Sequence, residues 1–178
     1  MGSAVSTGPG RGRRRTVGLK AHDARATPAG NIRTTAFGLL GRRDYTTAEL
    51  TQKLTDRGYD SADVEGTVAD LVRDRMLDDR RVAEAHVRTA SRLKGRGTIR
   101  IRRELSARGI ASAIIDEVTR DVSSDDQLAA IGRIVERKTG GRALDPAARR
   151  RLFQQLLRRG FPADLIAKAL RYKPDDDA

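Results

Sequence analysis

Four side chains near the middle of the chain have the chemistry that an enzyme or a metal site would need. Asp78, Asp79, Glu84 and His86 follow one another closely, and carboxylates beside an imidazole can transfer protons or ligate a metal ion. An acid directly before a helix, however, also caps the free amide groups and faces the positive end of the helix dipole. We therefore interpret this acidic cluster as structural, and we expect neither catalysis nor a bound metal or cofactor.

A glycine-rich loop is the second candidate for chemistry. Gly95 and Gly97 flank Arg96 directly after Lys94, and the backbone amides of such loops can hold phosphate groups. No strand pattern precedes the loop, and the spacing of a nucleotide-binding phosphate loop is missing. The glycines therefore give little support to a nucleotide site.

Basic side chains crowd around this loop and recur at a matched place near the C-terminus. We name them the basic strip, and its members are Lys94, Arg96, Arg100, Arg102, Arg103 and Arg108, then Arg149, Arg150, Arg151, Arg158 and Arg159. Arg100 and Arg103 are three residues apart on a predicted helix, so with Arg96 they are expected to share an exposed face. Such a strip would suit DNA phosphates or acidic groups of a protein, and charge alone leaves both open.

Composition favours an anionic partner and excludes several other classes. The 178 residues include 36 basic and 24 acidic ones, a net charge of +12, which favours polyanions, although solvated helix faces of an arginine-rich chain give the same count. Because the chain has no cysteine, disulfides and thiolate chemistry are excluded. No apolar run approaches the length that spans a bilayer, so we expect a cytoplasmic protein without a membrane partner.

Three stretches of the chain align at a constant spacing of 51 residues. The aligned residues are Leu50, Leu54, Arg57, Gly58 and Tyr59; Ile101, Leu105, Arg108, Gly109 and Ile110; and Leu152, Leu156, Arg159, Gly160 and Phe161. Each copy is typical of a helix end, because glycine can adopt the left-handed conformation and arginine faces the negative end of the helix dipole. We therefore expect a positive φ angle at Gly58, Gly109 and Gly160.

The periodicity around these stretches predicts an all-α fold of nine helices, arranged as three tandem three-helix repeats with helix-turn-helix-like units. We assign the repeats to residues 34–78, 79–123 and 124–172. A three-helix unit of this size buries its faces poorly on its own. We therefore expect neighbouring repeats to stack into an elongated, curved array.

Individual helix starts follow from local signals. Thr47 and Ser61 are expected to cap the second and third helices, and Asp145 before a proline is expected to start the eighth. The segment with Ile99 and Ile101 alternates like a strand. We nevertheless assign it to a helix, because it aligns with helical stretches of the other two copies.

The two ends of the chain have a different composition from the repeats. Residues 1–33 contain seven basic residues and one acid, with much Gly, Ser, Thr and Pro, and this composition predicts a disordered basic arm. The arm either binds the phosphates of a nucleic acid or is a basic tail without a function. Residues 173–178 form an acidic tail.

Residue types at three places along the repeats form a recognisable signature. They are Tyr45, Glu49, Leu50, Lys53 and Leu54 before Arg57-Gly58-Tyr59; Leu77-Asp78-Asp79-Arg80 with Ala83; and Gly95, Gly97, Arg100-Ile101, Glu104-Leu105 and Arg108-Gly109-Ile110. This signature resembles the RecX family of regulators of the RecA recombinase, over about residues 34–172. Val82 and Thr98 depart from it, since the family usually has an aromatic residue and often proline at these positions.

The resemblance implies a non-enzymatic protein that binds in the groove of the RecA–DNA filament and mainly inhibits strand exchange and the linked ATPase and co-protease activities. It places the chain in DNA recombination, DNA repair and the SOS response, as a monomer whose partners are the RecA filament, single-stranded DNA and double-stranded DNA. Without the resemblance, the residues predict only a helical repeat protein with a basic surface. A direct, sequence-nonspecific DNA-binding protein therefore stays an alternative, although the arginines are spread over the repeats rather than gathered on one recognition helix.

Overall fold

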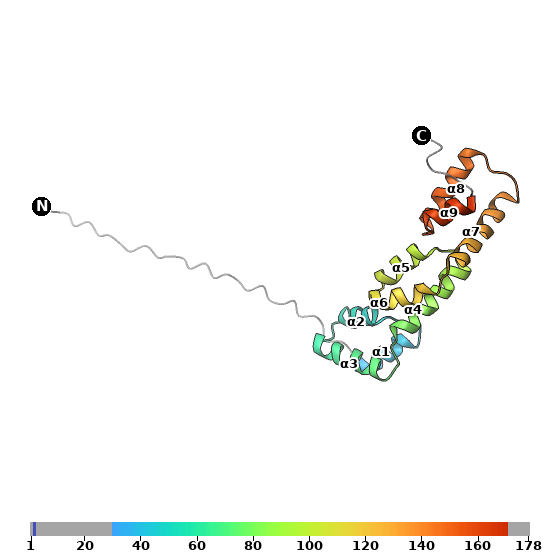
Figure 1. Cartoon of the computed structure of the whole chain (residues 1–178). Coiled ribbons are helices and arrows are strands. Elements are labelled where there is room, and N and C mark those ends of the chain that lie inside the picture. The colour runs from blue at the N-terminus through green and yellow to red at the C-terminus, as the bar shows by residue number, and fades with distance from the viewer. Residues whose placement is uncertain (1, 3–29, 171–178) are drawn as a thin grey trace.

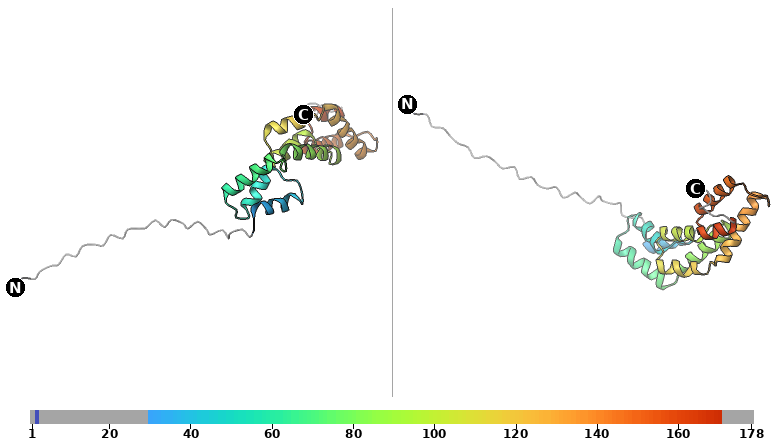
Figure 2. Two further views of the ribbon diagram at one scale, coloured as in Figure 1. Left: turned by 90° about the horizontal axis from the view of Figure 1, so that it is seen from below. Right: turned by 45° about the horizontal axis from the view of Figure 1, so that its top comes forward.

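The chain folds into an elongated, curved row of helices. The computed structural model describes Gly2 and residues 30–170, and within this part every regular element is a helix (Figure 1). The views in Figure 2 show that the helices follow one another along an arc from the N-terminal to the C-terminal repeat. The predicted all-α fold of three tandem three-helix repeats is thereby confirmed. None of the described helices combines the length and apolar composition that crossing a bilayer requires.

The first repeat contains three helices around an apolar core. They are α1 (Ile32–Leu40), α2 (Thr47–Thr55) and α3 (Ser61–Arg73). Leu50 and Leu71 are fully buried between them. Arg33, which the sequence assigned to the basic arm, lies in α1 and pairs with Asp70 of α3 at 2.9 Å, so the first repeat begins earlier than expected. Residues 1 and 3–29 of the arm and the acidic tail lie outside the described residues.

The second repeat has the same order of helices and one irregular turn. Its elements are α4 (Asp79–Arg88), the π-helical segment η1 (Thr89–Leu93), α5 (Thr98–Ala107) and α6 (Ser112–Arg120). Ile101 is fully buried in α5, whereas Ile99 is half exposed in its first turn. The helical assignment of this strand-like segment is therefore confirmed.

The third repeat contains the longest described helix. Its elements are α7 (Ser124–Thr139), α8 (Pro146–Arg158) and α9 (Ala163–Leu170). Ile131, Leu156, Phe161 and Ile166 form its buried centre.

Each repeat encloses its own apolar core, contrary to the expectation that a unit of this size buries its faces poorly alone. Separate clusters surround Leu54, Leu105 and Leu156, and all three of these residues are fully buried. Apolar side chains fill each centre, because the helices of one triplet pack against one another on their apolar faces. The elongated shape therefore arises from contacts between helix ends rather than from a continuous core.

Two helix starts lie one residue earlier than the sequence indicated. Thr46, not Thr47, caps α2, because its side chain accepts a hydrogen bond from the amide of Glu49 while the Glu49 carboxylate accepts one from the amide of Thr46. Asp60, not Ser61, caps α3 by accepting from the amide of Ala62 at 2.8 Å. At the start of α8 the cap is Asp145 as predicted, with an amide–carboxylate distance of 2.6 Å to Ala148.

Candidate functional site

The C-terminal end of α5 rests on the N-terminal end of α2. Thr46 Oγ1 donates a hydrogen bond to the carbonyl oxygen of Arg108 (2.7 Å), and the Arg108 guanidinium donates to the two carboxylate oxygens of Glu49 (2.9 and 3.0 Å). A Cβ atom on Gly109 would overlap the side chain of Ala48. The close approach of two oppositely charged helix ends therefore explains the glycine that follows the arginine.

The C-terminal end of α8 rests on the N-terminal end of α5 in the same way. The amide of Gly97 donates to the carbonyl of Arg159 (2.9 Å), and the amide of Ile99 donates to the carbonyl of Gly160 (3.1 Å). A Cβ atom on Gly160 would overlap the backbone of Arg100. Two amides at the start of α5 are thus satisfied by two carbonyls at the end of α8.

The arginine–glycine steps at Gly109 and Gly160 therefore each join the second helix of one repeat to the second helix of the repeat before it. Gly58, Gly109 and Gly160 have φ angles of 87°, 76° and 84°, which confirms the left-handed conformation predicted for all three. α8, α5 and α2 consequently follow one another end to end, and most of the basic strip lies along this row.

Glu104 of α5 gathers three basic side chains of the second repeat. Its carboxylate lies 2.6 Å from the Arg96 guanidinium, 2.8 Å from Nε of Arg100 and 3.0 Å from Nε2 of His86. Burial raises the pKa of Glu104, but these hydrogen bonds and the charge of Arg96 outweigh it and lower the pKa from 4.5 to about 2. The Arg96 side chain is only 25% exposed, so the expectation that Arg96, Arg100 and Arg103 share a free, exposed face is wrong.

The remaining members of the basic strip differ in their contacts. Arg102 pairs with Asp116 of α6, and Arg159 donates to the carbonyl oxygen of Gly95 at 3.5 Å. Exposed members whose side chains pair with no other described residue are Lys94, Arg103, Arg151 and Arg158. Arg149 donates to the carbonyl oxygen of Leu144 at 3.5 Å, and Arg150 is exposed on α8. The structure thus does not form the continuous free strip that the spacing suggested, since several arginines hold helices together.

Glu49 is the second carboxylate with a lowered pKa, and it lies where α5 meets α2. Burial raises its pKa, but the hydrogen bonds from Arg108 and the amide of Thr46, with the charges of Arg108 and Arg43, lower it from 4.5 to about 2. The pKa of Arg108 is raised by the same hydrogen bond, against the effect of its own burial. Both partners are therefore charged at neutral pH.

Stability in acid should depend on Glu104. Because its pKa in the folded state lies below the ordinary value of 4.5, its contribution to the free energy of unfolding is complete above about pH 4.5 and is lost as the pH falls toward about 2. We expect Glu104→Gln to lower the free energy of unfolding at about pH 7 and to differ less from the wild type at about pH 3. Urea unfolding followed by circular dichroism measures both values, and an equal difference at the two pH values would contradict the prediction.

The acidic cluster of the sequence has structural contacts. Asp78 caps α4 by accepting from the amide of Arg81 at 3.0 Å, and Asp79 accepts from the amide of Thr47 at 2.7 Å. Glu84 lies 4.0 Å from the Arg80 guanidinium. Within the described part of the chain, no three His, Asp or Glu side chains are placed to hold a metal ion. The predicted capping role of Asp78 is confirmed.

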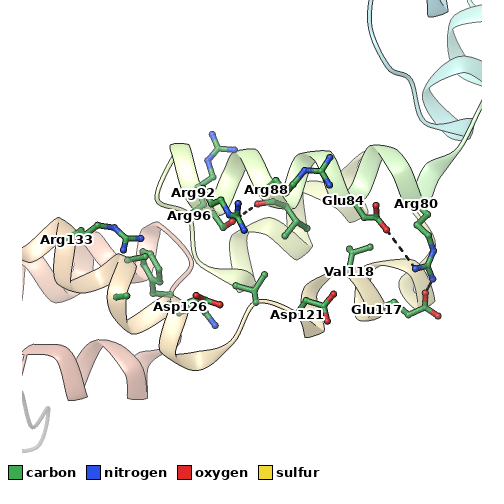
Figure 3. Close-up of a pocket in the computed structure, with 17 residues that line it drawn as sticks. Arg80, Glu84, Arg88, Arg92, Arg96, Glu117, Val118, Asp121, Asp126 and Arg133 are labelled. Carbon is green, nitrogen blue, oxygen red and sulfur yellow. Dashed lines mark hydrogen bonds and ion pairs between the residues drawn. The ribbon is translucent and has the colours of Figure 1, made fainter.

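A cleft between the second and third repeats was missed by the sequence reasoning. It has a volume of about 370 Å³ and lies between α4 with η1 on one wall and α6 with α7 on the other (Figure 3). Arg88 and Arg92 line the first wall, and Arg133 lines the second. Arg88 and Arg92 are four residues apart, a spacing that indicates a shared face in a regular α-helix, but Arg92 lies in the π-helical segment Thr89–Leu93. Nothing in the sequence places Arg133 opposite them.

Comparison with protein families identifies three matching regions. Residues 33–71 match the model described as RecX, first three-helix domain. Residues 78–118 match the second three-helix domain of RecX, and residues 125–170 match the third. Together these regions cover most of the described residues.

Curated proteins and solved structures show the same likeness. The chain is 40% identical over 149 residues to Regulatory protein RecX of Halorhodospira halophila, covering 82% of this chain and 90% of that protein. It is 37% identical over 147 residues to Regulatory protein RecX of Pseudomonas putida strain GB-1, covering 82% and 93%. The crystal structure of RecX from Lactobacillus salivarius has the same fold, with a TM-score of 0.73 at 21% identity, covering 79% of this chain and 92% of that one.

Proposed function

The chain belongs to the RecX family, and on that premise we propose that it is a non-enzymatic regulator that binds the RecA recombinase on DNA and mainly inhibits it. The observation that carries the proposal is the match of all three helical units, in order, to the three RecX domains. Inhibition would act on strand exchange and on the linked ATPase and co-protease activities. The proposal includes a monomer that works in the cytoplasm, in DNA recombination, DNA repair and the SOS response.

The shape of the molecule suits a long, grooved partner. Three repeats joined through helix ends make a curved body (Figure 1), and the row of α2, α5 and α8 runs through all of them. Lys94, Arg103 and Arg151 are exposed members of the basic strip whose side chains pair with no other described residue. Their charges are therefore available to DNA phosphates or to acidic groups of the recombinase.

Direct, sequence-nonspecific DNA binding is the second candidate function. The same three exposed cations and the net charge of +12 favour it, because phosphate neutralisation supplies most of nonspecific affinity. Binding to single-stranded and double-stranded DNA without RecA, measured at several salt concentrations, separates this function from recombinase regulation. A DNA-binding protein that leaves RecA activity unchanged would support the second candidate and contradict the first.

The exposed members of the basic strip should be needed for inhibition. We expect a Lys94→Glu, Arg103→Glu, Arg151→Glu variant to require about tenfold more protein for half-inhibition of RecA strand exchange, because three charges facing an anionic surface are reversed. Helicity and melting temperature should stay close to the wild type, since none of the three side chains pairs within the described structure. The measurement is strand exchange titrated with each protein, alongside circular dichroism.

A charge-conserving variant controls for the shape of these side chains. Lys94→Arg, Arg103→Lys, Arg151→Lys should inhibit nearly as well as the wild type, because exposed contacts depend mainly on charge. Full inhibition by the folded glutamate variant would remove the basic strip from the mechanism. A wild-type protein without effect on RecA strand exchange would overturn the proposed function itself.

A further inference from the structure

The cleft between the second and third repeats has an unneutralised basic end. Arg88 and Arg92 lie on one wall and Arg133 on the other (Figure 3), and the side chains of these three pair with no other described residue. Arg96 also lines the cleft, but Glu104 occupies its guanidinium at 2.6 Å. The basic end therefore has three guanidinium groups that form no ion pair with a described residue.

The opposite end of the same cleft carries carboxylates. Glu84 and Glu117 share the guanidinium of Arg80 there, while Asp121 and Asp126 line the cleft between this end and the arginines (Figure 3). A nucleic-acid backbone that followed the cleft would place its phosphates beside these four carboxylates, which would repel it. A protein segment avoids this cost, because it can present acidic groups to one end and polar or basic groups to the other.

The floor of the cleft is apolar and already formed. Val87 and Val118 face it from the two walls, and Phe161 closes it from the third repeat. These three side chains are at least nine-tenths buried, so the floor offers only a small apolar contact area. The volume of about 370 Å³ holds a few side chains rather than a whole helix.

The irregular turn η1 shapes the basic wall. Lys94 donates its amide to the carbonyl of Thr89 at 3.2 Å, and Arg96 donates its amide to the carbonyl of Ala90 at 3.0 Å. These bonds span more residues than those of an α-helix, and π-helical turns of this kind occur frequently at functional sites. The irregular turn therefore lies at the same place as the unpaired arginines.

We propose that this cleft is a protein-docking site that takes a short acidic segment of the recombinase, with an aliphatic side chain on the apolar floor and carboxylates against Arg88, Arg92 and Arg133. The inference rests on the proposed function, because it names the part of the chain through which the recombinase protein, rather than its DNA, is held. Arginine is enriched in the cores of protein interfaces, where it binds carboxylates in a bidentate manner.

Charge reversal in the cleft tests the proposal. Arg88→Glu, Arg92→Glu in the full chain should weaken binding to RecA assembled on single-stranded DNA by at least about tenfold, since two attractive contacts become repulsive. Binding to the same DNA without RecA should change no more than in a control with an equal change of charge. Arg42→Glu, Lys53→Glu is that control, because both side chains are exposed in the first repeat and neither lines the cleft.

The readouts are fluorescence anisotropy of labelled DNA for DNA binding, surface-immobilised filaments for filament binding, and circular dichroism for folding. Arg88→Lys, Arg92→Lys should recover part of the affinity, because it restores the charge without the bidentate geometry. Equal losses on the filament and on bare DNA would identify a nucleic-acid site and overturn the proposal. Filament binding equal to that of the control would also overturn it and leave the proposed function intact. A wild-type chain that does not bind the filament would overturn both.

Discussion

Replacing Gly97 with alanine is expected to destabilise the protein by about 3 kcal/mol, as overpacking against rigid backbone does. Gly97 has an ordinary φ of −78°, so the backbone conformation itself tolerates alanine. The new methyl group would instead overlap the carbonyl of Gly160 and the amide of Phe161. The third repeat would have to move away, and the bonds from Gly97 to Arg159 and from Ile99 to Gly160 would be lost.

Thermal unfolding followed by circular dichroism and calorimetry measures this effect. Because each repeat has its own core, we expect loss of the junction to separate the unfolding of the third repeat from that of the first two. Gly66→Ala and Gly132→Ala are matched controls, since both glycines lie inside exposed helix faces with no atom near an added Cβ. Each should stabilise by about 1 kcal/mol. A Gly97→Ala protein as stable as these controls would contradict the end-to-end arrangement.

Local signals predicted the helix ends because they depend on the residues of one turn. The arginine–glycine step was visible at three places, and the left-handed conformation follows from glycine alone. The sequence did not show what the step packs against, since Glu49 and Arg108 are 59 residues apart in the chain. The partner of Arg100 was within reach, because Glu104 lies four residues further along the same helix.

The cleft lay beyond prediction for a different reason. Helical periodicity assigns faces on the assumption of a constant 3.6 residues per turn, and the π-helical segment Thr89–Leu93 breaks that assumption. The orientation of Arg92 relative to Arg88 therefore depends on the hydrogen bonds of this turn, which the residue types do not predict. Arg133 belongs to the third repeat, so its place opposite Arg88 required the tertiary structure.

Replacing Glu49 with arginine is expected to destabilise the junction between the first and second repeats by about 2 kcal/mol, because a quarter-exposed ion pair becomes a repulsive one. The change removes both hydrogen bonds from Arg108 and the bond from the amide of Thr46. It also places a cation at the positive end of the α2 dipole. Urea unfolding at low and high salt measures the loss, and the repulsive part should shrink as salt screens it.

The second junction shows how this loss can be repaired. Arg100 occupies there the position that Glu49 has in the first junction, 51 residues earlier, and it turns to Glu104 on its own helix at 2.8 Å. The position equivalent to Glu104 in α2 is Lys53, so an arginine at 49 finds no acid four residues along. Adding Lys53→Glu to Glu49→Arg should therefore recover about 1 kcal/mol by rebuilding the Arg100–Glu104 arrangement. Lys53→Gln in the same background removes the charge without supplying an acid and should recover less. Equal recovery with glutamine and glutamate would show that residues 49 and 53 do not form the ion pair seen between Arg100 and Glu104.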